Sequence, residues 1–185
     1  LAGLSPTTTA YTVNNVCGAG LQSVILAAQT ISFGASDCII AGGAESASRT
    51  PQLFSKLVET PYNEREPVVS LIYDGLWCNL SGKSMGEICE EFAQEEKISR
   101  TAQDRYALES HQKARVGKFS EEIVDVFLAD GSVFHIDERI RRRINIENFK
   151  TLPSSFVKNG TVTSGNASVP ADGAAAVLVA GEKFV

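Results

Sequence analysis

Apolar residues follow two different periods near the start of the chain, and together they predict a strand, a helix and a second strand. Residues 10–16 form a short β-branched and apolar run that predicts a buried strand. Residues 21–32 carry apolar positions at helical spacing, with further apolar residues opposite, which predicts a helix buried nearly all round and ended by Gly34. Residues 38–43 form a continuous apolar run, as in a strand covered on both faces. This order predicts a βαβ unit, whose parallel strands are joined by a right-handed crossover.

The sequence becomes more polar after Glu45 and returns to small apolar residues only near its end. The patterns in this part predict a helix over 85–96, a helix over 101–116 with a capping pattern at Thr101 and Asp104, a hairpin of residues 123–128 and 133–136 around Asp130-Gly131, and a strand over 173–180. The order of a core-like stretch, a long polar stretch and a second core-like stretch predicts an insertion within one domain. We therefore assign residues 1–48 and 157–185 to the core and residues 49–156 to the insertion.

Composition and charge exclude several function classes. The chain has 185 residues, of which 43% are hydrophobic and 21% charged, as in a soluble globular protein with a real core. The net charge of −5 and the lack of a basic stripe argue against a nucleic-acid partner. A membrane partner is not expected either, because no apolar run is long enough to span a bilayer and no charged-then-apolar leader is found. The short basic run Arg139–Arg143 fits a solvated loop or a contact with phosphates.

The chain has four cysteines, and none of them forms a CxxC pair, so no metal site is expected. Their scattered spacing indicates free thiols in a reducing compartment, which is the cytoplasm or, alternatively, an organellar matrix. Cys38 lies in an apolar run and Cys89 on a predicted helix, and both fit the role of a small buried hydrophobe.

Cys17 differs because it stands where the first predicted strand turns into the first predicted helix, in the stretch VNNVCGAGL. A thiol attacks only as a thiolate, and the unpaired N–H groups and positive dipole of a helix start stabilise an anion. Gly18 and Gly20 keep side chains away, so that a substrate carbonyl can approach, and the Cys17 amide is a candidate oxyanion donor. The pattern predicts a nucleophile elbow, with an ordinary core cysteine as the alternative.

Several segments resemble thiolases, in the order that this family has them. VNNVCGAGLQSVILAAQTISFGASDCIIAGGAES resembles the region around the acyl-accepting cysteine. IYDGLWCNLSGKSMGEICEEFA and ISRTAQDRYALESHQKA resemble the loop domain, and GTVTSGNASVPADGAAAVLVA resembles the end of the N-terminal core half. The resemblance implies an α/β thiolase-like fold, namely the N-terminal core half, a mixed sheet with buried helices, with an inserted α+β loop domain. It is incomplete, because thiolases are about twice as long.

The same resemblance implies an acyl-CoA C-acyltransferase of fatty acid metabolism, which forms or cleaves 3-ketoacyl-CoA such as acetoacetyl-CoA through a thioester on cysteine. Coenzyme A and acyl-CoA are then substrates, no cofactor is expected, and the assembly is a homodimer or tetramer with residues 10–16 near the interface. Position by position, the resemblance assigns Cys17 as the nucleophile, Met85 along the pantetheine arm, Leu76 in the tunnel wall, Phe156 in the pocket wall, and Ser168 as a hydrogen-bonding partner of the pantetheine amide. Structural roles are the alternatives, since Met85 and Phe156 suit core packing and Ser168 suits a turn.

The chain departs from the family at two points. Ser84 stands where short-chain biosynthetic thiolases carry a histidine before Met-Gly. The family's catalytic histidine and second cysteine come from a C-terminal half that these residues do not include. His111 and His135 are expected to be exposed and not to act as the base. We therefore expect the 185 residues not to turn over by themselves.

Two other functions stay open at this point. A non-catalytic thiolase-like module would bind CoA or a partner chain without chemistry. A ketoacyl synthase would also place a cysteine at a helix start, although it lacks this loop-domain excursion. A cysteine hydrolase of the papain or α/β-hydrolase type fits worst, because no usable histidine follows Cys17.

Overall fold

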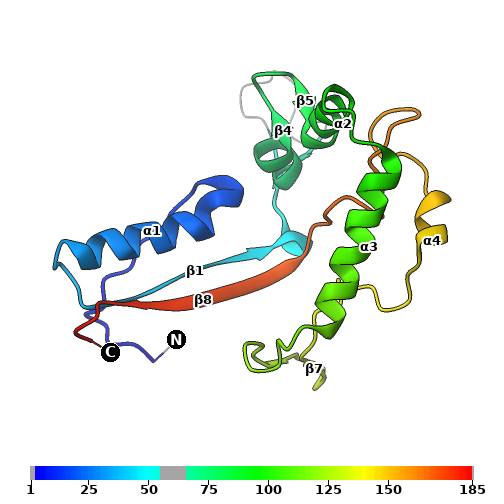
Figure 1. Cartoon of the computed structure of the whole chain (residues 1–185). Coiled ribbons are helices and arrows are strands. Elements are labelled where there is room, and N and C mark those ends of the chain that lie inside the picture. The colour runs from blue at the N-terminus through cyan, green and yellow to red at the C-terminus, as the bar shows by residue number, and fades with distance from the viewer. Residues whose placement is uncertain (1–2, 55–65, 185) are drawn as a thin grey trace. The chain divides into compact units, whose positions relative to one another are not determined.

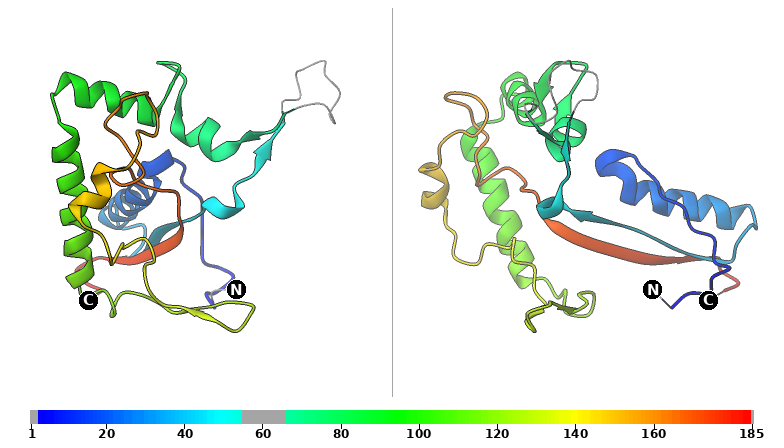
Figure 2. Two further views of the ribbon diagram at one scale, coloured as in Figure 1. Left: turned by 90° about the vertical axis from the view of Figure 1, so that its right-hand side faces the viewer. Right: turned by 180° about the vertical axis from the view of Figure 1, so that it is seen from behind.

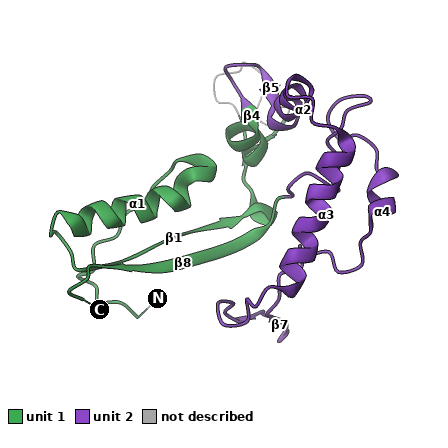
Figure 3. Ribbon diagram, in the orientation of Figure 1, with its two compact units in different colours: residues 1–77, 170–185 green, residues 78–169 purple. Residues whose placement is uncertain are grey.

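The computed structural model describes residues 3–54 and 66–184. The chain divides into two compact units, which are coloured separately in Figure 3. Unit 1 comprises Leu1–Trp77 and Pro170–Val185, and unit 2 comprises Cys78–Val169. The domain boundaries expected at residues 49 and 156 stay a prediction about the family's domains.

Unit 1 is built on an antiparallel ribbon of two long strands. β1 (Cys38–Ser46) pairs with β8 (Asp172–Ala180), in a register that sets Cys38 opposite Ala180 and Ser46 opposite Asp172. α1 (Ala19–Ser32) runs along one face of this ribbon (Figures 1 and 2). The helix ends as expected, because Gly34 follows it with a φ of +73°, which costs glycine little.

The structure overturns the expected βαβ unit. Residues 10–15 form no strand, because within the described chain no segment pairs with them. The partner of β1 is the antiparallel β8, which comes from the far end of the sequence. The helix is not buried all round either, since Ala27 is the one buried residue of α1 and Leu21 is 69% exposed. Apolar periodicity reports which positions favour burial and not which element covers them.

The remainder of unit 1 follows β1 as short elements. They are η2 (Ala47–Arg49), β2 (Gln52–Leu53), its antiparallel partner β3 (Val68–Val69) and the π-helical turn η4 (Leu71–Leu76). The backbone N–H of Ser48 donates to the Asp172 carboxylate at 2.8 Å, which ties the end of β1 to the start of β8.

Unit 2 is mainly helical. A short ribbon of β4 (Trp77–Cys78) and β5 (Lys83–Ser84) leads into α2 (Met85–Glu95), and α3 (Arg100–Val116) follows. The predicted hairpin is confirmed, with the shorter strands β6 (Val126–Phe127) and β7 (Val133–Phe134), and α4 (Ile146–Lys150) lies beside α3 (Figure 1). No helix in residues 3–54 or 66–184 is both long and apolar enough to cross a membrane.

The caps of the two long helices follow from short polar side chains. Ser84 caps α2 through a capping box in which Glu87 reaches back to the Ser84 N–H at 2.8 Å. The start of α3 differs from expectation, because the cap is Ser99, whose hydroxyl accepts from the Ala102 N–H at 3.2 Å. Thr101 already lies inside the helix, so the predicted capping pattern at Thr101 and Asp104 is wrong.

Candidate active site

The candidate nucleophile lies in a turn directly before α1. Val16–Gly18 form the 3₁₀ turn η1, Gly18 is the N-cap of α1, and Cys17 is exposed. The Gly18 N–H donates to the Asn15 carbonyl at 2.9 Å, and the Ala19 N–H donates to the Val16 carbonyl. These two amides are therefore engaged within the turn, whereas the positive end of the helix dipole still lies behind the thiol.

A strained residue precedes Cys17. Val16 has a φ of +48°, in the left-handed region that β-branched residues avoid. The side-chain oxygen of Asn14 accepts a hydrogen bond from the Val16 N–H at 3.1 Å and so holds the turn in this conformation. Strain of this kind costs on the order of 1–3 kcal/mol and is concentrated at functional sites. The sharp turn expected of a nucleophile elbow is present.

Unit 2 brings two of the predicted pantetheine residues together. Met85 is the first residue of α2, and Gly86 follows it. A Cβ atom on Gly86 would lie 2.2 Å from the ring of Phe156, so the ring rests directly on the Gly86 backbone. Met85 and Phe156 are 42% and 46% exposed, and both leave apolar surface open to a ligand. Met85 adjoins Gly86 along the chain and the Phe156 ring lies on Gly86, and we call the exposed apolar surface of these two side chains the apolar wall.

The other two predicted residues lie elsewhere. Leu76 is the last residue of η4 in unit 1 and is 37% exposed. Ser168 is exposed in unit 2, in the segment that leads towards β8. Just before it, Asn166 donates to the carboxylate of the buried Asp104 at 2.8 Å and thereby ties this segment to α3.

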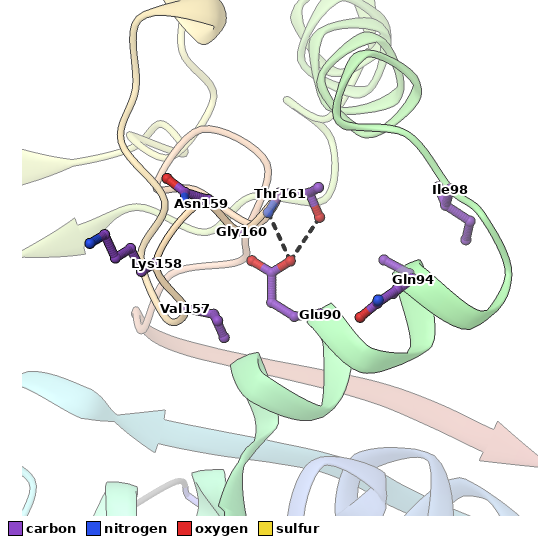
Figure 4. A pocket seen from close by; sticks show the side chains of 9 residues that line it. Glu90, Gln94, Ile98, Val157, Lys158, Asn159, Gly160 and Thr161 are labelled. Atoms are coloured by element: carbon purple, nitrogen blue, oxygen red, sulfur yellow. Dashed lines mark hydrogen bonds between the residues drawn. The ribbon is translucent and has the colours of Figure 1, made fainter.

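The loop that carries Phe156, residues 155–162, is fixed to α2 by one carboxylate. Glu90 accepts hydrogen bonds from the Thr161 N–H at 2.8 Å and the Thr161 hydroxyl at 2.9 Å (Figure 4). It also accepts one from the Val162 N–H at 2.7 Å. Burial raises the pKa of the Glu90 carboxyl, but these hydrogen bonds and the positive charge of Arg100 outweigh it, so the pKa lies below its ordinary value. Beside Glu90 is a hollow of about 360 Å³, lined also by Gln94, Ile98 and the loop itself.

The basic run and the two histidines take structural positions. The Arg141 guanidinium donates to the Ser164 carbonyl at 2.7 Å, and its backbone N–H donates to His111 Nδ1 at 3.2 Å. His111 is therefore half-buried, and the expectation that it is exposed is wrong. His135 is exposed, as expected, with Nδ1 3.3 Å from the Val133 carbonyl.

The cysteines are all free thiols, as predicted. Cys38 is half-buried, whereas Cys89 is exposed, so the interpretation of Cys89 as a buried hydrophobe is wrong. Cys78 is half-buried, and hydrogen bonds from the Ser81 side chain and backbone lower the pKa of its thiol. Within the described ranges, no cluster of histidine, cysteine, aspartate and glutamate is arranged to hold a metal ion.

Comparison with known proteins identifies this arrangement. The family model described as "Thiolase, N-terminal domain" matches residues 1–183. The chain belongs to the thiolase family. Its 40% identical relatives include a probable acetyl-CoA acetyltransferase of Escherichia coli K12, with 97% of this chain and 48% of the relative covered. Another is the mitochondrial acetyl-CoA acetyltransferase erg10A of Aspergillus fumigatus, also 40% identical, with 100% of this chain and 44% of the relative covered.

Solved thiolases share the fold. Human mitochondrial 3-ketoacyl-CoA thiolase in complex with CoA matches with a TM-score of 0.88 and 34% identity over 98% of this chain and 47% of its own. The Acat5 thiolase of Ascaris suum in complex with coenzyme A matches with a TM-score of 0.86 and 32% identity over 97% of this chain and 47% of its own. The predicted thiolase-like fold is thus confirmed, and the chain spans about half the length of the thiolases it matches.

Sequence reasoning missed three residues that hold the surroundings of predicted site residues in place: Asn14 in unit 1, and Gly86 and Glu90 in unit 2. Glu90 shares a helix face with Gly86, four residues before it, and with the buried Ala93, three residues after it. Small residues at that spacing indicate a closely packed face, where a carboxylate needs specific donors. The signal for Asn14 was its place two residues before Val16, which is the spacing of a side-chain turn.

Proposed function

We propose that this thiolase chain supplies the nucleophile and part of the pantetheine wall of an acyl-CoA C-acyltransferase. Cys17 attacks the carbonyl of an acyl-CoA, the bond between that carbon and the CoA sulfur breaks, and the CoA thiolate leaves while the acyl group stays on Cys17 as a thioester. The acyl group then passes to the α-carbon of a second acyl-CoA, which gives a 3-ketoacyl-CoA such as acetoacetyl-CoA. In the degradative direction the same thioester forms by cleavage of a 3-ketoacyl-CoA and is released by coenzyme A.

One observation carries this proposal: in a chain of the thiolase family, Cys17 is exposed in a strained turn at the positive end of α1. A solvent-accessible thiol at a helix start is placed to react as a thiolate, whereas a structural cysteine is buried and inert. Neither histidine fits the role of base, because His111 Nδ1 already accepts a hydrogen bond and His135 lies by an exposed hairpin. The base for the α-proton is therefore assigned to neither histidine.

The pantetheine arm is assigned to four apolar or small polar side chains: Leu76, Met85, Phe156 and Ser168. Support comes from the wall of Met85 and Phe156 around Gly86, because thioether and aromatic side chains suit an apolar ligand chain. Arg142 and Arg143 are exposed and can meet phosphates of the nucleotide, whereas Arg141 is already bonded to Ser164. Coenzyme A is thereby a substrate and no further cofactor is needed.

Assembly and location complete the proposal. The exposed apolar surface of α1, with Leu21 69% exposed, supports a homodimer or tetramer. We infer a cytoplasmic protein, with an organellar matrix as the alternative, because free thiols persist in reducing compartments.

The test is acetyl trapping in the full-length protein. After incubation with acetyl-CoA, peptide mass spectrometry is expected to find one acetyl group on Cys17. Cys17→Ala should abolish it, whereas Cys89→Ala, which removes another exposed thiol, should not. Binding of coenzyme A without acetylation of Cys17 would reject the acyltransferase and favour a non-catalytic binding module.

A further inference from the structure

Glu90 is an acidic side chain on the packed face of α2 whose carboxylate bonds entirely to one loop. Three donors converge on it, two from Thr161 and one from Val162. The absence of a side chain at Gly160 makes this approach possible, because a Cβ there would lie 2.3 Å from Glu90 Oε1. The next residue, Glu91, forms only an exposed ion pair with Lys83. The half-buried carboxylate of Glu90 thus fixes the position of the loop of residues 155–162 (Figure 4).

The loop transmits this position to Phe156. Ser155 donates its N–H to the Val162 carbonyl at 2.9 Å, and Ser154 forms an antiparallel bridge with Thr163, so the two ends of the loop are closed on each other. Gly160 donates to the Val157 carbonyl at 2.9 Å and tightens the interior. A closed loop of this kind moves as one piece. Any shift at Thr161 therefore moves the Phe156 ring.

The helix transmits the same position to Met85. Glu90 lies five residues after Met85 in α2, which is about one and a half turns of a rigid helix. The carboxylate therefore joins the two elements that form the apolar wall, one carrying Met85 and Gly86 and the other carrying Phe156. Without the hydrogen bonds to Glu90, the position of Phe156 relative to α2 would depend on the contact of its ring with Gly86. Because Phe156 is 46% exposed, only about half of the ring's area can contribute to that contact.

We propose that Glu90 is a positioning residue for acyl-CoA, because its carboxylate fixes the position of Phe156 relative to Met85 in the apolar wall against which the pantetheine arm lies. This inference rests on the proposed function. Glu90 touches no reacting atom and acts through Thr161 and Val162. A misplacement of a binding wall by about 1 Å is enough to weaken productive binding strongly.

The experiment measures the affinity of the full-length protein for coenzyme A by calorimetry, in wild type, Glu90→Gln and the matched control Glu91→Gln. Glutamine keeps the size of the side chain but turns an NH₂ group towards N–H donors, so at least one hydrogen bond to a charged acceptor is lost. The dissociation constant of Glu90→Gln is expected to rise about tenfold, and that of Glu91→Gln to stay unchanged. Alkylation of Cys17 by iodoacetamide should proceed at the wild-type rate in both, since its turn lies in unit 1.

The outcomes separate the two proposals. A folded Glu90→Gln protein with the affinity of Glu91→Gln overturns the positioning role, and so does an equal loss of CoA affinity and of Cys17 alkylation, which signals general damage. A wild type that binds no coenzyme A instead rejects the proposed function. If Glu90→Gln fails to fold, Thr161→Val decides, with Gln103→Ala as its control because the Thr161 hydroxyl also accepts a hydrogen bond from Gln103 Nε2 at 2.9 Å. Thr161→Val removes one of the three donors to Glu90 and keeps the backbone bonds. Its dissociation constant should rise about threefold, and an unchanged value counts against the proposal.

Discussion

Substitution of Gly86 by alanine tests the apolar wall at the start of α2. An added Cβ would lie 2.2–2.3 Å from three atoms of the Phe156 ring, closer than any van der Waals contact. The α2 backbone cannot yield, because the capping box of Ser84 and Glu87 fixes the helix start. The ring of Phe156 must therefore rotate off the helix, which opens the wall.

The magnitude follows from the exposure of the ring. Phe156 is 46% exposed, so about half of a phenylalanine's area, roughly 100 Å², is buried against its neighbours. Loss of that burial costs about 2.5 kcal/mol at 25 cal/mol per Å². This loss is offset by about 1 kcal/mol, because alanine has a higher helix propensity than glycine. We expect the free energy of unfolding to fall by about 1.5 kcal/mol in Gly86→Ala.

Urea denaturation followed by circular dichroism measures this change, with Gly20→Ala as the matched control. Gly20 is likewise the second residue of its helix, but a Cβ there meets nothing within 4 Å. The control should gain up to about 1 kcal/mol. In a Phe156→Ala background, Gly86→Ala should also become stabilising, because the obstacle is gone. The reasoning is refuted if Gly86→Ala stabilises the wild-type protein as much as Gly20→Ala does.

Three further predictions concern the helix cap, the nucleophile turn and pH. In urea denaturation, Ser99→Ala should lower the free energy of unfolding by about 1 kcal/mol, and Thr101→Ala should lower it much less. Equal losses would contradict the assignment of Ser99 as the cap of α3. Asn14→Ala should slow the alkylation of Cys17 by iodoacetamide, because it removes the bond that holds the turn. Asn15→Ala removes a side chain without a capping bond and should leave the rate unchanged. Equal rates in the two variants would contradict the role of Asn14 in the turn. Because the pKa of Glu90 is lowered on folding, its stabilisation should be complete above its ordinary value of 4.5 and be lost as pH falls through the folded value. In urea denaturations at a series of acidic pH values, the free energy of unfolding should fall less steeply with pH in Glu90→Gln than in the wild type. An unchanged pH dependence would contradict a stabilising role of the Glu90 carboxylate.

Several elements were predictable from the sequence because their signals are local. α2, the β6–β7 hairpin and the strand β8 lie where apolar spacing and the Asp130-Gly131 turn place them. Gly34 follows the end of α1 with a φ of +73°, and Gly117 ends α3 in an extended conformation with a φ of −63°, so each helix end is set by residues next to it in the chain. The cap of α3 was misplaced by two residues, because neighbouring serine and threonine side chains offer the same oxygen.

Part of the site was equally visible in the sequence. The stretch around Cys17 carries its own turn chemistry, and the structure shows the thiol exposed in a turn at the start of α1. The left-handed conformation of Val16 was not predictable, because valine is the kind of residue that avoids it. The hydrogen bond from the Val16 N–H to Asn14 stabilises that conformation.

The sequence by itself therefore determined α1, α2 and α3, the hairpin turn, the family and the candidate nucleophile Cys17, because each of these signals lies in residues close together along the chain. The tertiary structure alone decided that β1 pairs with β8, that Glu90 holds Thr161, and that Phe156 lies on Gly86. The physical reason is that a strand edge, a buried carboxylate and an aromatic ring each require a partner without specifying where in the chain it lies. Folding selects that partner through the simultaneous satisfaction of hydrogen bonds and close packing.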